Sequence, residues 1–111
     1  MTTTEDVMNH LLAEAAPALP ARVLADIFDR LIWILRDNGE EIVRVREAWL
    51  LGEDERKVEV ALEMEEVFPF RDRAAMAKEF DRILARWPRF APQCERILRD
   101  WDKNFEGKPQ P

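Results

Sequence analysis

The chain has 111 residues and a formal net charge of −6, with 47% hydrophobic and 36% charged side chains. This length suits one domain, and this composition excludes wholesale disorder and indicates a globular protein. The longest apolar run, residues 31–35, is far shorter than the roughly 20 residues of a membrane span, so no membrane segment is expected.

Two helices are predicted in the N-terminal third of the chain. Thr3 or Thr4 can cap the first helix. Pro20 suits the first position of a second helix, which we expect to run over about residues 21–37 until Gly39 ends it. The apolar arc of this second helix is wide, and the helix should therefore be central and the most buried element.

A β-hairpin is predicted in the middle of the chain. Residues 57–65 alternate apolar and polar side chains, which on a strand places the apolar ones on a single face. A strand over about residues 43–51 would pair with this segment across the four-residue loop 52–55. The competing interpretation is two more helices, because residues 53–55 would make a good helix N-terminus and residues 61–65 are strong helix formers.

Two further helices are predicted after the hairpin. Asp72 is expected to cap a third helix, which Pro88 ends, and Pro92 can open a fourth. The predicted fold is therefore α+β, with two N-terminal helices, a central β-hairpin and two C-terminal helices in one compact domain over residues 1–106. Residues 107–111 are expected to form a flexible tail. If residues 42–66 are helical instead, the fold is an all-α helical bundle.

The sequence contains no motif with recognisable catalytic or metal-binding chemistry. His10 is the only histidine and has no partner at a metal-ligand spacing, and Cys94 is expected to be a buried structural cysteine. With three glycines in the chain, a phosphate-binding loop is not expected. We therefore expect no catalytic residue, no metal site and no cofactor. One cysteine and no basic leader segment favour a cytoplasmic protein.

A dense group of carboxylates is the first candidate binding site. Its members lie in the predicted hairpin loop and along the second strand: Glu53, Asp54, Glu55, Glu59, Glu63 and Glu65. Residues 1–70 hold 16 acidic and 7 basic side chains, a balance of −9. The simplest interpretation is a solvated face. The functional one is a small acidic, non-catalytic protein-binding module that masks a basic surface on an unknown partner, as an inhibitor, an immunity-type protein or a chaperone-like adaptor.

Trp33 is a further candidate for protein binding. It lies between Ile32 and Ile34 on the predicted second helix and is expected to point away from the main core stripe. A helix that is apolar on nearly all sides is either fully wrapped or pressed against another chain. Because few small elements are available to wrap it, a homodimer through this helix is a further expectation.

A basic face on the predicted third helix is the second candidate site. Its residues recur at helical spacing: Lys78, Arg82, Arg86 and Arg89. Such a face can contact nucleic-acid phosphates or a partner's carboxylates. Acidic neighbours interrupt it, and the overall negative charge argues against nucleic acid. A nucleic-acid-binding module, and an enzyme whose site becomes visible only in the fold, remain the alternatives to the protein-binding module.

Overall fold

The structure, a computed structural model, describes residues 3–34, 36–37, 39–65, 67–70 and 72–106. Over these residues the protein is all helical, with six α-helices and no strand. The predicted α+β fold with a central β-hairpin is therefore wrong, and the helical alternative is correct. The chain divides into two compact units, unit 1 (Met1–Val67) and unit 2 (Phe68–Pro111). A single domain over residues 1–106 stays a prediction, and the expected tail at 107–111 lies outside the described residues.

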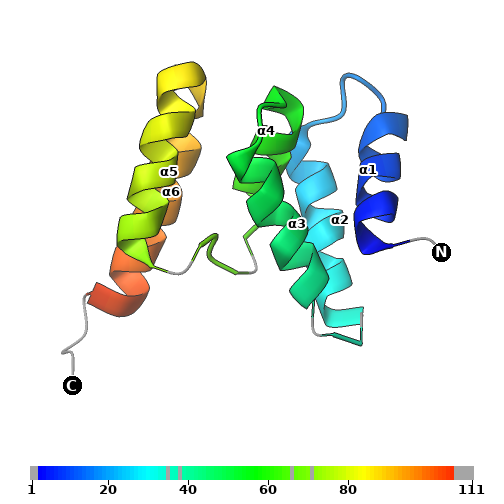
Figure 1. Ribbon diagram of the computed structural model, residues 1–111, viewed down its shortest axis with the longest axis horizontal. Coiled ribbons are helices and arrows are strands. Elements are labelled where there is room, and N and C mark those ends of the chain that lie inside the picture. Colours follow the sequence, from blue (N-terminus) through cyan, green and yellow to red (C-terminus); the bar gives the residue numbers. More distant parts are fainter. Residues whose placement is uncertain (1–2, 35, 38, 66, 71, 107–111) are drawn as a thin grey trace. The chain divides into compact units, whose positions relative to one another are not determined.

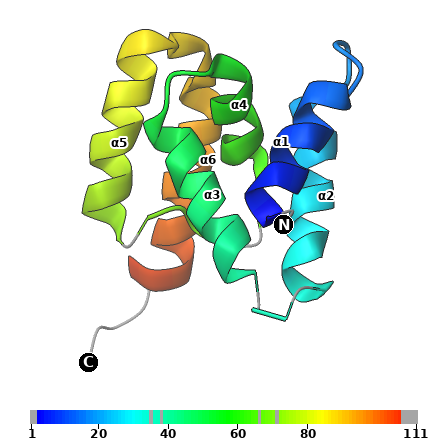
Figure 2. The ribbon, with the colours of Figure 1, turned by 45° about the vertical axis from the view of Figure 1, so that its right-hand side comes forward.

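Unit 1 contains four helices that alternate in direction along the chain, as Figures 1 and 2 show. They are α1 (Thr4–Glu14), α2 (Ala21–Ile34), α3 (Glu40–Leu51) and α4 (Glu55–Glu63). The fourth helix packs against both α2 and α3, while α1 packs against α3. Phe28 of α2 meets Trp49 of α3 edge to face, with ring centroids 5.9 Å apart. The core of unit 1 therefore lies between α2, α3 and α4.

The first helix begins as the sequence predicts. The Thr3 hydroxyl accepts a hydrogen bond from the Asp6 backbone N–H at 3.0 Å, and the Asp6 carboxylate accepts one from the Thr3 N–H at 3.1 Å. This reciprocal capping box satisfies two of the donors that a helix start leaves without partners.

The connection from α2 to α3 begins earlier in the chain than predicted. Helix α2 begins at Ala21, as expected, but ends at Ile34 rather than Asp37. The Asp37 carboxylate instead accepts hydrogen bonds from the backbone N–H groups of Gly39 (2.9 Å) and Glu41 (3.1 Å) at the start of α3. Gly39 has a φ of 78°, and a Cβ there would lie 2.6 Å from the Ile32 side chain, so only glycine fits this turn.

Residues 57–65, predicted as a strand, lie mostly in α4, and the helix has a clear start. The Asp54 side chain accepts a hydrogen bond from the Lys57 N–H at 3.1 Å. Four apolar side chains of this helix are fully buried: Val58, Val60, Ala61 and Leu62. On a helix these four positions spread around much of the axis, and α4 can bury them because it contacts two other helices. The alternating pattern therefore reflects a helix buried on several sides, not a pleated strand.

Unit 2 is an antiparallel helix pair (Figure 1). It contains α5 (Arg73–Arg86), a 3-10 turn (Pro88–Phe90), α6 (Ala91–Trp101) and a π-helical turn (Asp102–Glu106). The predicted cap is confirmed, because the Asp72 side chain accepts a hydrogen bond from the Ala75 N–H at 2.8 Å. Arg73 makes a bidentate ion pair with Asp102, at 2.6 and 3.2 Å, which ties the start of α5 to the end of α6.

Candidate protein-binding surface

The two sides of helix α2 differ in burial. Its inner side places Leu24, Phe28 and Ile32 in the core. Its outer side exposes both charged and apolar side chains, and the apolar positions 23, 27 and 34 fall within about 40° of one another around the helix axis. We call the exposed apolar side chains Val23, Ile27, Trp33 and Ile34 the outer α2 face.

The outer α2 face is most exposed at the C-terminal end of the helix. Trp33 retains 75% and Ile34 retains 72% of their accessible surface, against about 40% for Val23 and Ile27. The expectation that Trp33 points away from the core is confirmed. Trp33 points about 100° away from Ile34 around the helix axis. Several large apolar side chains exposed on one helix are a feature of interaction surfaces, whereas a single exposed one is ordinary.

A charged pair accompanies these apolar residues. Arg30 Nε lies 3.1 Å from the Asp26 carboxylate, one helical turn away, and both side chains are exposed. Such an exposed pair contributes little to the stability of the monomer, about 0.5 kcal/mol. Its charges therefore remain available to an approaching surface at small cost.

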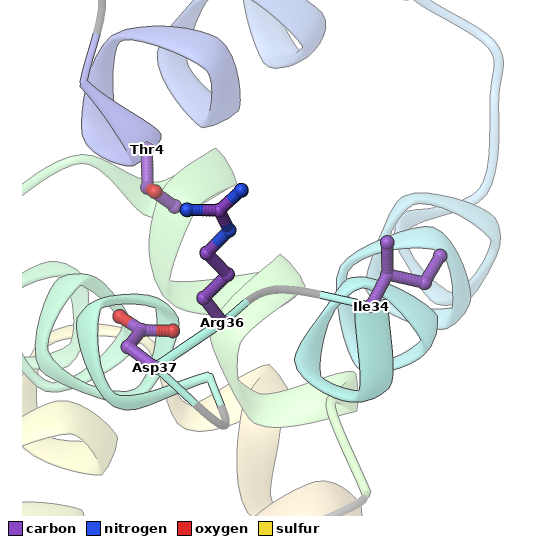
Figure 3. Close-up of a pocket in the computed structure, with 4 residues that line it drawn as sticks. All are labelled: Thr4, Ile34, Arg36 and Asp37. Atoms are coloured by element: carbon purple, nitrogen blue, oxygen red, sulfur yellow. The ribbon is translucent and has the colours of Figure 1, made fainter.

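A hollow adjoins the end of α2. Figure 3 shows Arg36 extending toward Thr4 at the start of α1, with Ile34 on the other side of the opening and Asp37 below it. These four residues line an open cavity of about 480 Å³. Ile34 therefore belongs both to this lining and to the outer α2 face, whereas Thr4, Arg36 and Asp37 are polar or charged.

The predicted acidic site is not a strand face, because that strand does not exist. Glu53, Asp54 and Glu55 lie at the turn from α3 to α4, where Asp54 is the helix cap. Glu59 and Glu63 lie one turn apart on α4 and line a smaller hollow of about 190 Å³ together with Pro20, Ala21 and Arg22. Glu65 follows the end of α4, and its N–H donates to Asp29 at 2.9 Å.

The predicted basic residues all belong to unit 2. Lys78 and Arg82 lie on α5, with Arg82 paired to Glu79 at 3.1 Å. Arg86 lies over the ring of Trp87, with 4.9 Å from the guanidinium carbon to the ring centroid, and Arg89 lies over Phe90 at 4.2 Å. Three of the four residues therefore contact partners within their own unit.

A buried arginine was missed by the sequence reasoning. Arg46 of α3 is 1% exposed and donates to three backbone carbonyls, those of Ala61 (2.8 Å), Met64 (2.5 Å) and Val67. Its role is to satisfy the carbonyl oxygens at the C-terminal end of α4. No sequence pattern marks it, because its acceptors are backbone atoms 15 to 21 residues further along the chain.

Other candidate chemistry has a structural explanation. Cys94 is buried, as expected, and burial, with a smaller contribution from the charge of Glu95, raises the pKa of its thiol to about 12. Within the described residues, His, Cys, Asp and Glu side chains form no group of three or more that could hold a metal ion. Nor does any described helix have the length and apolar character needed to cross a membrane.

Comparisons with known proteins do not identify a family. Protein-family models gave no match to this chain. Searches of curated proteins and of solved structures gave none either. A proposal about function must therefore start from the outer α2 face itself.

Proposed function

We propose that this protein is a small non-catalytic protein-binding module, and that the outer α2 face is its binding surface. The observation that carries the proposal is the exposure of both Trp33 and Ile34 at the end of a helix whose inner side is buried in the core. Tryptophan is enriched among the residues that dominate the binding energy of protein interfaces.

The energetics favour a protein partner for this surface. Covering the exposed part of Trp33 would contribute on the order of 4 kcal/mol at about 25 cal/mol per Å² of apolar area. Ile34, Val23 and Ile27 extend the same apolar area along the helix. Such a surface costs solubility when it is left open, which is a physical reason to expect that it is covered in the cell.

The acidic residues and the basic face are weaker candidates. The acidic side chains are divided among a turn, a half-buried hollow and the segment after α4, and Asp54 already serves as a helix cap. On α5, Glu79 and Asp81 stand among the basic residues and oppose binding to phosphate backbones. A basic partner for the acidic group, and a location in the cytoplasm, remain predictions from the sequence.

Site-specific photocrosslinking tests the proposal. A photoreactive amino acid is placed at position 33 of the full chain in its native cells, and at position 14, exposed at the end of α1, as the control. We expect protein adducts from position 33 that position 14 does not give. Equal labelling from the two positions, or no adduct from position 33, would refute the outer α2 face as a binding surface.

A further inference from the structure

The charge around α2 differs from that of the rest of unit 1. Residues 1–67 hold 16 acidic and 7 basic side chains, a balance of −9. Residues 21–37 hold three of each: Arg22, Arg30, Arg36, Asp26, Asp29 and Asp37. The segment that carries the exposed apolar side chains is therefore neutral. A basic partner would gain nothing from this neutrality, whereas a second copy of the chain could approach through it without meeting like charge at the contact.

The order of the exposed charges along α2 favours one orientation of two such helices. Asp26 stands one turn nearer the N-terminus than Arg30, and both are exposed on the outer side. Two parallel copies would place Asp26 against Asp26 and Arg30 against Arg30. Two antiparallel copies place the Asp26 of each beside the Arg30 of the other, which joins two ion pairs into a network of four alternating charges.

The apolar side chains fit the same arrangement. If a two-fold axis relates the two copies so that Asp26 of each contacts Arg30 of the other, the axis passes α2 at the level of Phe28. It also brings Val23 of each copy beside Ile34 and Trp33 of the other, and it places Ile27 close to the axis. The least and the most exposed ends of the outer α2 face thus cover each other, as a self-complementary interface requires.

We propose that the partner of the outer α2 face is a second copy of this chain, packed antiparallel along α2. This inference rests on the proposed function and names its partner. Helix α2 has 14 residues and is about 21 Å long, so a single helix pair buries less than the roughly 800 Å² per partner of a standard interface. The dimer is therefore expected to have a dissociation constant in the micromolar range.

Charge exchange in the purified full chain tests the arrangement. Sedimentation equilibrium from about 1 to about 500 µM covers the expected range of dissociation constants. Asp26→Arg places two positive charges on the outer α2 face and Arg30→Asp places two negative charges there, so each variant is expected to dimerise at least 10-fold more weakly than the natural chain. An equal mixture of the two variants restores opposite charges at both contacts and is expected to form the mixed dimer.

Glu40→Arg is the matched control. Glu40 lies on α3 and forms an exposed ion pair with Arg44, one helical turn later, at 3.5 Å. This variant should dimerise like the natural chain. Dimers of unchanged strength in both single variants, or no mixed dimer, would overturn the antiparallel pairing. A natural chain that stays monomeric throughout, while position 33 cross-links to a different protein, would overturn self-association and leave the proposed function standing. Monomers with no cross-link would refute both.

Discussion

Arg46 shows how a buried charge can complete a helix in place of a glycine cap. Helix α4 ends at Glu63, and its cap residue Met64 is extended rather than left-handed. The three hydrogen bonds that Arg46 donates hold the carbonyls of Ala61, Met64 and Val67. A planar guanidinium offers five N–H donors in fixed directions, which a lysine ammonium cannot match.

Removing the guanidinium should therefore be costly. The substitution Arg46→Met keeps the apolar part of the side chain but removes the charged donor of three carbonyls. We therefore expect the free energy of unfolding to fall by about 3 kcal/mol. Arg44→Met, two residues away at an exposed ion pair, should cost about 0.5 kcal/mol or less. Urea unfolding of both variants measures the difference. Equal effects would show that the Arg46 contacts contribute no more than a surface pair.

The buried thiol of Cys94 predicts a specific loss of stability at alkaline pH. Burial raises the pKa of the thiol from 9.0 to about 12 in the folded protein, with a smaller contribution from Glu95. A raised folded-state pKa means that the unfolded chain releases this proton first, so the stabilisation is complete below pH 9 and is lost as the pH rises from about 9 toward 12.

Between pH 8 and pH 10, the natural chain should lose about 1 kcal/mol of unfolding free energy more than Cys94→Ala does. The alanine variant is less stable at every pH because of the lost packing, but it lacks the proton release. Denaturant unfolding of both proteins at the two pH values gives the comparison. The same pH dependence in both proteins would contradict a raised thiol pKa.

At the scale of the helices, the sequence predicted the structure best where neighbouring residues alone determine where a helix begins or ends. Thr3, one of the two residues predicted to cap the first helix, and Asp72 are caps, because a hydroxyl or carboxylate before a helix needs only the N–H groups two or three residues later. Pro88 ends α5 as expected, since the ring constrains its own backbone and that of the residue before it. These elements depend on contacts within a few residues, which a single sequence contains.

The prediction of a hairpin was wrong because the contacts that decide the structure of this segment come from residues far away in the sequence. A period of two predicts a strand only if one face is exposed, and α4 is instead buried by α2 and α3 together. The outer α2 face was partly missed for the same reason. Val23, Ile27 and Ile34 lie on the helix that was expected to be the most buried element, but the packed neighbours cover only the side that carries Leu24 and Phe28. Trp33 alone was expected to point outward.

The cap of α4 offers a direct test of the helix that replaced the hairpin. Asp54→Ala removes the side-chain acceptor of the Lys57 N–H and should cost about 1 kcal/mol of unfolding free energy. Asp54→Asn keeps the acceptor and removes the charge, so it should cost only a few tenths of a kcal/mol. Thermal unfolding monitored by circular dichroism measures the stability of both variants. If both variants lose the same stability, the charge of Asp54 matters and its cap does not.

Over the whole molecule, the division of charge coincides with the division of structure. Unit 1 carries 16 acidic and 7 basic residues, a balance of −9, and residues 68–111 carry 7 acidic and 10 basic residues, a balance of +3. Within unit 1 the neutral segment 21–37 is the exception. Two copies that meet through α2 therefore meet through a segment without net charge rather than through the acidic remainder of unit 1.

This arrangement predicts that thermal stability depends on concentration. If the folded chain is an antiparallel dimer and the unfolded chain a monomer, each tenfold rise in concentration above the dissociation constant stabilises the folded state by about 0.7 kcal per mole of chain. For a chain of this size, that energy should raise the Tm by a few degrees. Asp26→Arg should show the same unfolding curve at every concentration, because it leaves the core intact and removes the pairing. Calorimetry at about 10 and about 500 µM measures both proteins. A Tm that is constant for the natural chain would mean that it does not dimerise over this range. A Tm that rises equally in the variant would mean that the association does not use the outer α2 face.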